Sequence, residues 1–393
     1  MTHRLARAAI ALVVAAAGLA AAAPGTAAQE PSAPRKPAPA PKPIAHFPYV
    51  GGTEIAFSGR YVYAAQMDGH LERGEAPDQG GIHIFDVGGR RPRKVGFLHC
   101  PGNDNDVAVI RPGLVALGYH SNKCAPGQGM VLVDVSNPRR PRVISHVDVP
   151  SSHTITAHPE KPIVYISPGG IAYAGGPEQI VDVSDPYHPE VVATYSNNPN
   201  GCHDLSFHIT KERELAFCAG LTEVQVWDVS DPLAPVTIAH IANPAIQYPH
   251  YAEVSPDGKT LVINDEAFAA HDCTTGQSPT GAIWTYDVTD PTAPALLGHF
   301  SPPRGEPGVG TEVGWVSTWC TSHQFSFTSN GHLIVPWFTG GTSFINMSDP
   351  AAPRETSYYQ PEDAIAYSSQ FRDDYVYISD MNRGLEILGI RGG

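Results

Sequence analysis

Asp182-Val183-Ser184-Asp185-Pro186 is one copy of a short motif that returns along this 393-residue chain. The other copies read Asp134-Val135-Ser136-Asn137-Pro138, Asp228-Val229-Ser230-Asp231-Pro232, Asp287-Val288-Thr289-Asp290-Pro291 and, in degenerate form, Asp86-Val87-Gly88 and Asn346-Met347-Ser348-Asp349-Pro350. A last unit without the turn ends at residues 385–390. Successive spacings between equivalent positions, counted from Asp86 to Gly389, are 48, 48, 46, 59, 59 and 43 residues. A regular period of this kind indicates a repeat architecture, here with seven units.

Each unit carries the pattern of four short strands. In the fourth unit, runs rich in β-branched or aromatic residues occupy 204–207, 214–217, 223–227 and 236–240, and Gly, Pro, Asn and Asp stand between them. The repeated Asp-Pro then forms the hairpin turn between the third and fourth strands, a structural role. We therefore predict an all-β fold, a seven-bladed β-propeller.

The start of the chain is expected to close the ring. Residues 44–47 resemble the fourth strands of other units, such as 95–99 and 296–300, whereas the final unit ends at its third strand. An N-terminal strand that completes the last blade would remove two exposed sheet edges. The predicted propeller spans residues 44–393.

Two segments precede the predicted propeller. Residues 1–28 carry Arg4 and Arg7, an apolar run at 8–23 and small residues up to Ala28, which is typical of a secretory signal peptide. The apolar run is shorter than the ~20 residues of a membrane span. Residues 29–43 hold six prolines and are expected to form an extended tether. We predict a secreted, extracellular protein with no membrane span.

The chain is acidic, with 39 Asp and Glu against 25 Lys and Arg and a formal net charge of −14. This balance argues against nucleic acid and anionic membranes as partners, because their phosphates would be repelled. The long insertions, at 67–81, 118–128, 265–281 and 301–322, all fall on one face of the predicted propeller, here called the loop face. Loops on a rigid scaffold commonly carry function. We expect a monomer with a small-molecule ligand at the loop face.

Six cysteines in an exported chain predict three disulfides. Cys202 and Cys218 flank one hairpin, and the loop positions favour Cys100 with Cys124 and Cys273 with Cys320 among 15 possible connectivities. A free or catalytic thiol at Cys202, beside His203, is the alternative.

Four consecutive units place a histidine at the entry to the innermost strand, facing the channel: His153, His203, His250 and His323. The same position is Thr53, Asn105 and Asp363 in the other units, and the next position adds Glu54, Asp106, Asp204 and Gln324. Imidazoles with carboxylates suit a transition metal such as copper, iron or zinc. Two alternatives remain open. The histidines are polar channel packing, or they form a ligand or catalytic site without metal. Histidine also recurs on the outermost strands, where the blades hold the side chains too far apart to share a metal, so a repeated histidine need not be a ligand.

Two carboxylates are the catalytic candidates. One is Asp204, which follows His203, and the other is Glu253, which interrupts a series of small residues on the innermost strands. Asp265 and Glu266 are further candidates for an acid or base. Common motifs of hydrolases, kinases and zinc peptidases are absent from the sequence. One hypothesis is therefore a metal-dependent oxidoreductase or lyase that acts on a small molecule. The other is a noncatalytic extracellular scaffold that binds a protein, a glycan or a wall polymer.

Residues 131–138, 180–186 and 384–388 resemble the LVIVD repeat family of secreted or surface β-propellers. The resemblance extends over nearly all of the predicted propeller. It implies the fold but no activity, because the repeat motif is structural. The pair His203-Asp204 also resembles the His-Asp that opens repeats in that family, which favours a structural role for the pair.

Overall fold

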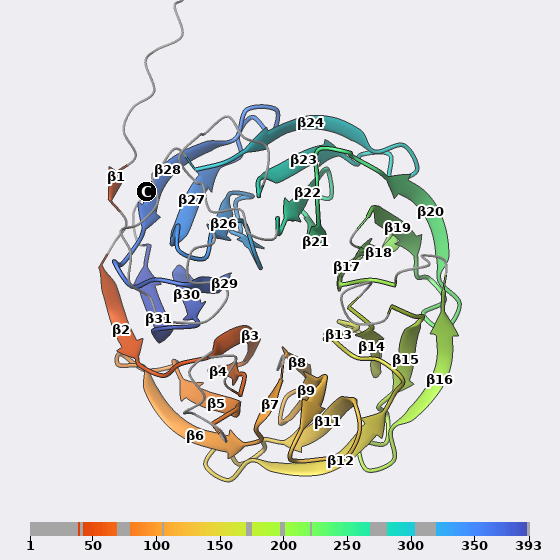
Figure 1. The fold of residues 1–393 in the computed structure, drawn as a ribbon, viewed down its shortest axis with the longest axis vertical. Helices are drawn as coiled ribbons and strands as arrows, with labels where there is room; N and C mark the ends of the chain where they lie inside the picture. The colour runs from red at the N-terminus through yellow and green to blue at the C-terminus, as the bar shows by residue number, and fades with distance from the viewer. Residues whose placement is uncertain are drawn as a thin grey trace, which may run out of the picture. The chain divides into compact units, whose positions relative to one another are not determined.

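Seven antiparallel sheets surround a central channel in the computed structural model, as the repeat predicts (Figure 1). The structure describes residues 38–39, 42–68, 79–103, 106–169, 175–196, 201–220, 222–267, 281–302 and 320–390. The predicted signal peptide lies outside these residues.

The blades follow one another around the ring, each with its first strand innermost. Blade one is β3 (Gly52–Ser58), β4 (Tyr61–Gln66), β5 (Gly81–Asp86) and β6 (Arg93–His99). Blade two is β8 (Asp106–Arg111), β9 (Leu114–Tyr119), β11 (Gly129–Asp134) and β12 (Arg142–Asp148). Blade three is β13 (Thr154–Ala157), β14 (Ile163–Ser167), β15 (Glu178–Asp182) and β16 (Glu190–Tyr195). Blade four is β17 (Asp204–Ile209), β18 (Glu214–Ala219), β19 (Val224–Asp228) and β20 (Val236–Ile241).

The remaining blades differ slightly from this plan. Blade five is β21 (Pro249–Val254), β22 (Thr260–Asp265), β23 (Ile283–Asp287) and β24 (Ala295–Phe300). Blade six is β25 (Ser326–Phe327), β26 (Leu333–Pro336), β27 (Thr342–Asn346) and β28 (Arg354–Tyr359). Blade seven is β29 (Ala366–Arg372), β30 (Tyr375–Asp380), β31 (Gly384–Gly389) and β2 (Pro43–Phe47). A two-residue ribbon, β7 (Gly102–Asn103) with β10 (Ser121–Asn122), accompanies blade two.

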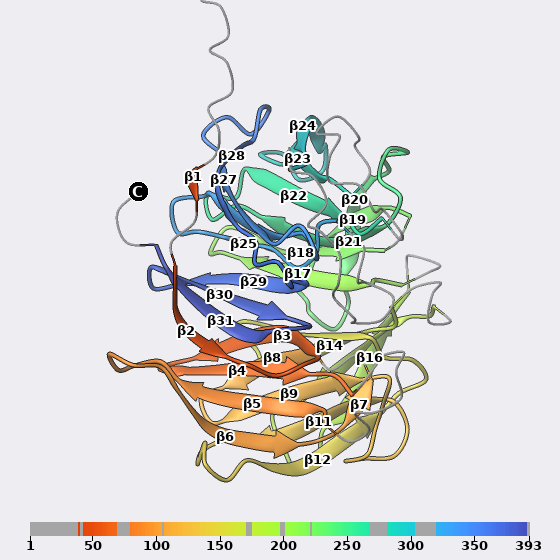
Figure 2. The ribbon, with the colours of Figure 1, turned by 60° about the vertical axis from the view of Figure 1, so that its left-hand side comes forward.

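The ring closes as the sequence predicts. Strand β2 pairs antiparallel with β31, with Phe47 opposite Leu385, and so supplies the outermost strand of the last blade. Strand β1 (Ala38–Pro39), within the segment expected to be a tether, pairs in parallel with β28 on the edge of blade six. In the turned view, β2 runs along the outer edge of β31 (Figure 2).

The recurring aspartate stabilises a turn. The Oδ1 atoms of Asp134, Asp182 and Asp228 accept a hydrogen bond from the backbone N–H two residues later, at 3.0, 2.7 and 2.9 Å. This is the Asx turn expected of Asp before a hairpin. The predicted structural role of the motif is confirmed.

The disulfide pairing is largely as expected. Cys100 is bonded to Cys124 and Cys202 to Cys218. The hypothesis of a free thiol at Cys202 is therefore wrong. Cys320 is also disulfide-bonded, and its predicted partner, Cys273, lies outside the described residues.

Hydrophobic clusters fill the spaces between neighbouring blades. One of them joins the middle strands of blade four to β21, β22 and β23 of blade five, with Phe217, Leu261 and Trp284 all at most 5% exposed. Such packing fixes each innermost strand against the next. Side chains at the channel ends of these strands are therefore held on a rigid frame.

Candidate metal centre

Local backbone structure brings the four predicted histidines to the channel. His153 and His203 stand one residue before β13 and β17, and their N–H groups donate to Ser167 O and Ala219 O at 2.8 and 2.6 Å. His250 lies on β21 within an irregularity of the pairing with β22. His323 precedes β25, and its N–H donates to the carbonyl of Pro336. Each histidine is thus fixed by the first hydrogen bonds of its blade or by a bulge.

The four imidazoles form a continuous arc across blades three to six. Ring centroids are 4.1 Å apart for His153 and His203, 4.2 Å for His203 and His250, and 4.1 Å for His250 and His323. All four side chains are buried. His120 extends the arc, because its Nε2 lies 2.8 Å from His153 Nδ1.

The arc borders one small cavity. Its volume is about 20 Å³, enough for a water molecule or an ion of similar size. It is lined by Glu54, Asp106, His153, Thr154, His203, Asp204, His250, His323 and Tyr367. All four predicted metal ligands therefore meet at one place, together with Asp204 and two further carboxyl groups.

Burial controls the charges around this cavity. It lowers the pKa of His250 well below its ordinary value, with the other imidazoles adding to the effect, and lowers that of His323 to about 3. These two rings are neutral at physiological pH and can offer lone pairs. Burial also raises the pKa of Asp204 and Asp106 to about 7, and that of Glu54 well above its ordinary value, with Asp106 adding to the last. A bound cation would stabilise the charged carboxylates and so lower these raised pKa values again.

The tautomer of His323 is set by its backbone partner. Its Nδ1 lies 2.8 Å from the carbonyl oxygen of Tyr367, which can only accept, so Nδ1 carries the proton. The lone pair is then on Nε2, which lies 3.7 Å from Glu266 Oε1. A backbone carbonyl that orients the ring in this way is the usual support of a metal-binding histidine.

Two overlapping groups have the spacing of metal ligands. His203, Asp204 and His250 form one, and His250, Glu266 and His323 the other, each with ligand atoms within 4.8 Å of one another. Asp204 Oδ2 lies 3.5 Å from His203 Nδ1 and 3.3 Å from His250 Nδ1, and Glu266 Oε2 lies 3.5 Å from His250 Nε2. These separations exceed those of an N–H···O hydrogen bond. They match the ~3.4 Å between two ligand atoms that bind one tetrahedral ion at ~2.1 Å.

Not every candidate residue reaches the cavity. Glu253 does not line it; its Oε2 accepts a hydrogen bond from the Tyr251 hydroxyl at 3.3 Å, and burial raises its pKa to about 7. The equivalence assumed for Asp363 is wrong, because this residue is exposed and pairs with Arg383. Asn105 lies outside the part of the chain that the structure describes.

Sequence reasoning missed or misassigned three contributors. Glu266 was expected only as an acid or base, and it faces two of the imidazoles. His120 lies in the insertion at 118–128 and contacts His153. The Tyr367 carbonyl has no signal in the sequence, since a backbone atom orients His323 whatever the side chain.

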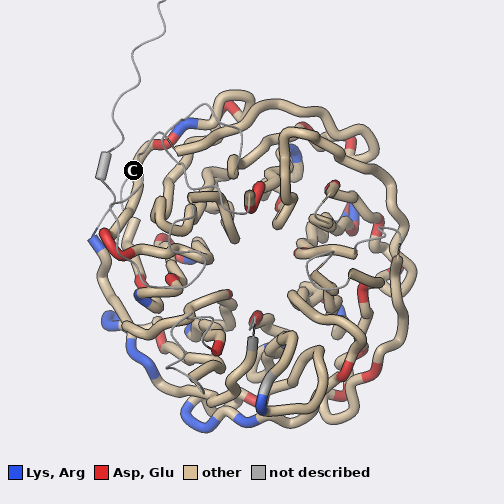
Figure 3. The backbone as a smooth tube through the Cα atoms, viewed as in Figure 1, with Lys and Arg blue, Asp and Glu red and all other residues tan. Residues whose placement is uncertain are grey.

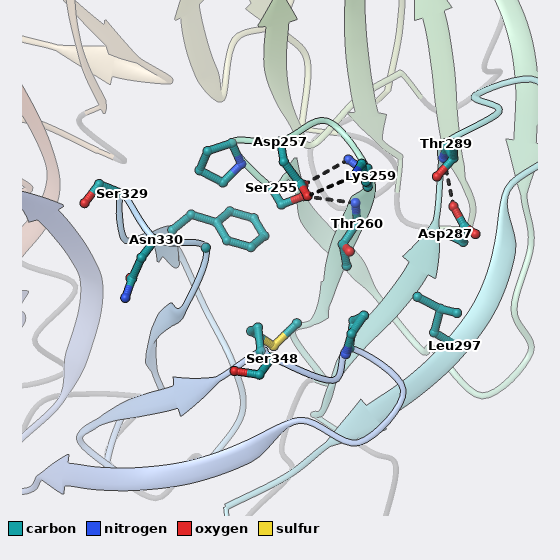
Figure 4. A pocket seen from close by; sticks show the side chains of 15 residues that line it. Ser255, Asp257, Lys259, Thr260, Asp287, Thr289, Leu297, Ser329, Asn330 and Ser348 are labelled. Atoms are coloured by element: carbon teal, nitrogen blue, oxygen red, sulfur yellow. Dashed lines mark hydrogen bonds and ion pairs between the residues drawn. The ribbon is translucent and has the colours of Figure 1, made fainter. Parts of the chain in front are cut away.

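A larger cavity lies on the face opposite to the loop face, between the hairpins of blades five and six (Figure 4). Its volume is about 570 Å³, within the range of small-ligand sites. Its polar groups are engaged in the turns themselves: Asp257 Oδ1 accepts from Ser255 Oγ at 2.6 Å and from Lys259 N at 3.2 Å. Neither group with metal-ligand spacing includes any residue of this cavity.

Comparisons with known proteins agree with the architecture. A family model described as LVIVD repeat matches residues 125–149 and 171–197. The chain carries LVIVD repeats. These LVIVD repeats include β11 and β12 of blade two and β15 and β16 of blade three, the strands that flank the aspartate turns. No curated protein matches the sequence.

Solved structures are similar in fold at low sequence identity. YCF48 bound to D1 peptide has a TM-score of 0.58 and 10% identity, over 92% of this chain and 100% of that one. The periplasmic gluconolactonase PpgL of Pseudomonas aeruginosa has a TM-score of 0.56 and 11% identity, over 78% and 86% of the two chains. A putative 6-phosphogluconolactonase from Bacteroides fragilis has a TM-score of 0.54 and 10% identity, over 84% and 94%. Likeness at this level of identity concerns the fold alone.

No helix among the described residues has the length and apolarity that crossing a bilayer requires. The disulfides and the LVIVD repeats are compatible with a secreted protein.

Proposed function

We propose that this chain is a secreted metal-binding propeller that holds one transition metal ion at the histidine-lined cavity. The observation that carries the proposal is the meeting of His153, His203, His250 and His323 at a cavity of about 20 Å³. An organic molecule does not fit in this volume, whereas one ion does.

Charge and hydrogen bonding favour a cation over polar packing. A packed polar network would join each imidazole N–H to an acceptor at hydrogen-bond distance. Around His250 the carboxylate oxygens instead lie at 3.3 and 3.5 Å, and no hydrogen bond is formed by its buried Nδ1. A neutral imidazole carries one proton only, so it cannot donate to both Asp204 and Glu266.

His250 is the central ligand of the proposal. It belongs to both groups of candidate ligands, so an ion in either position uses it. Its Nε2, the Nε2 of His323 and a Glu266 oxygen form a His₂Glu set. In this set the Tyr367 carbonyl orients His323, and Asp204 faces the opposite nitrogen of His250.

The donor atoms indicate the class of metal. Imidazole nitrogen with one or two carboxylate oxygens suits zinc, copper or iron, whereas calcium and magnesium prefer oxygen ligands. Three protein ligands leave a coordination position for water, which is typical of metals that act as Lewis acids or in redox reactions. A metal-dependent oxidoreductase or lyase acting on a small molecule remains our proposal for the activity, and the size of the cavity supports ion binding more directly than catalysis.

Cobalt substitution tests both parts of the proposal. The chain is expressed without a metal-affinity tag, stripped with chelator and titrated with Co²⁺ while the visible spectrum is recorded. We expect an intense four- or five-coordinate spectrum that saturates at one equivalent and shifts when azide is added to an open position. His250→Ala should abolish the spectrum, whereas Glu253→Gln, which changes a half-buried carboxyl group outside the cavity lining, should leave it intact.

The possible outcomes separate the two hypotheses. A weak six-coordinate spectrum, or one that survives in folded His250→Ala, would contradict metal binding at this place. A saturable spectrum that does not respond to azide would support metal binding and contradict an open catalytic position.

A further inference from the structure

Two neighbouring hairpins share a basic tetrapeptide that the other blades lack. Arg-Arg-Pro-Arg occurs at residues 90–93 and again at 139–142, in the turns between the third and fourth strands of blades one and two. The residues in the place of the Arg-Arg doublet are Tyr187-His188, Leu233-Ala234, Thr292-Ala293 and Ala351-Ala352 in blades three to six. The doublet is therefore not a requirement of the propeller turn.

The fold accounts for only the last arginine of each tetrapeptide. Arg93 Nη2 lies 3.0 Å from Asp86 Oδ2, and Arg142 Nη2 lies 2.8 Å from Asp134 Oδ2. These pairs anchor the fourth strand to the aspartate of the turn. The doublets, Arg90-Arg91 and Arg139-Arg140, are exposed, and their side chains form no ion pair with the residues that the structure describes.

The two hairpins lie side by side. Gly96 of β6 packs so closely against the Pro138 carbonyl that a Cβ atom would come within 1.8 Å of its oxygen. In Figure 3 the Lys and Arg segments gather at the margin of the ring next to β6 and β12, whereas Asp and Glu segments are spread around it. Lys94 follows the first tetrapeptide, so seven of the chain's 25 Lys and Arg stand in these two turns or at the start of the strands that follow them.

We propose that the two hairpins form a binding surface for an extended polymer with regularly spaced phosphate groups, of which inorganic polyphosphate is the simplest. Guanidinium groups bind such anions through two parallel hydrogen bonds. The local positive field contrasts with the net charge of −14, so a polyanion is attracted here and repelled elsewhere. The conclusion drawn from net charge alone, that anionic partners are disfavoured, does not apply to this surface.

An extended polymer fits this surface better than a membrane does. The arginines stand at turn tips on the face opposite to the loop face, and no exposed large hydrophobic residue of the described chain lies in either turn. Proteins that lie on a bilayer usually insert such residues beside their basic ones. Exposed apolar side chains stand beside the turns, with Ile44 lining a cavity with Arg90 and Pro92, and Tyr187 next to Arg142; comparison with anionic vesicles therefore belongs to the test.

Binding of long-chain inorganic polyphosphate to the full chain, in the presence of chelator, tests the proposal. If four arginines each contact a phosphate, the logarithm of the binding constant should fall with the logarithm of the NaCl concentration with a slope of about −3, taking ~0.7 per contact. The affinity should then drop about 50-fold between 50 and 200 mM NaCl. The variant R90Q/R91Q/R139Q/R140Q should bind at least ~10-fold more weakly at 50 mM. It keeps Arg93 and Arg142, so its turns should fold, which unfolding in denaturant verifies.

A variant that loses the same number of positive charges outside the two hairpins provides the matched control. K211Q/R213Q/K259Q/R354Q removes four exposed basic residues outside the two hairpins and should bind like the wild type. Equal weakening in the two variants would show an effect of net charge and overturn the proposal. Absence of binding at 50 mM, or tighter binding to phosphatidylglycerol vesicles than to the polymer, would also overturn it.

Discussion

Removal of the disulfide between Cys202 and Cys218 is expected to lower the free energy of unfolding by about 3 kcal/mol. The bond joins residues 16 positions apart with Cα atoms 5.2 Å from each other, and the loss of loop-closure entropy in the unfolded chain gives this magnitude. Both residues are fully buried. The double variant Cys202→Ala/Cys218→Ala also loses two sulfur atoms from the core, so the measured loss should not fall below the entropic value.

The disulfide between Cys100 and Cys124 is the matched control. Its separation of 24 residues predicts a loss about 0.3 kcal/mol larger by the same entropic argument. The two double variants should therefore unfold at similar denaturant concentrations.

Only the first double variant should also affect the metal centre. Cys202 directly precedes His203, so its bond to Cys218 restrains the backbone that positions this ligand. Metal affinity should therefore fall about 10-fold, as for the loss of a residue that orients a ligand, while Cys100→Ala/Cys124→Ala keeps its affinity.

Guanidinium unfolding followed by tryptophan fluorescence, with chelator present, gives the stabilities. Cobalt titration of the same proteins gives the affinities. A loss of less than about 1 kcal/mol in the Cys202 double variant would refute the entropic argument. Equal loss of metal affinity in both variants would refute the link between this disulfide and His203.

Three further predictions concern single side chains. The hydroxyl and amide of Ser136 lower the pKa of Asp134 to about 2 from an ordinary 3.8. The charged carboxylate therefore stabilises the fold fully above pH 3.8, and this stabilisation is lost as the pH falls through about 2. In urea unfolding, Asp134→Asn should lower the free energy of unfolding by about 1 kcal/mol at pH 7 and by nearly nothing at pH 2. His120→Ala removes the partner of His153 Nδ1 and should weaken cobalt binding by ~10-fold or more without abolishing it, and an unchanged affinity would show that His153 needs no support. Trp227 is 1% exposed, so Trp227→Ala should lower the free energy of unfolding by about 3–5 kcal/mol. A loss under about 1 kcal/mol in guanidinium unfolding would contradict its core position.

The fold was predictable because its signals are local and repeated. Asp and Pro at the turns specify hairpins through interactions within a few residues, as the bond from Ser184 N to Asp182 Oδ1 illustrates. The period then gives the number of blades. Ring closure followed from one missing strand at the end and one spare strand at the start, and β2 fills that place.

The histidines could be predicted for the same reason, whereas their surroundings could not. In a closed ring, equal positions on successive innermost strands come close together, which places His203 beside His250. The rule failed for Asp363, which is exposed and pairs with Arg383 instead of joining the histidines. Glu266 approaches the imidazoles from the end of a second strand, and only three-dimensional structure relates that strand end to the channel.

Metal content is the measurement that tests the central claim most directly. The secreted chain, purified without a metal-affinity tag, is compared by elemental analysis with His250→Ala and with His299→Ala, whose histidine is exposed on β24. We predict about one equivalent of zinc, copper or iron in the wild type and in His299→Ala, and none in His250→Ala. No bound metal in the folded wild type after reconstitution with each ion, or the same content in all three proteins, would contradict a metal centre at the channel.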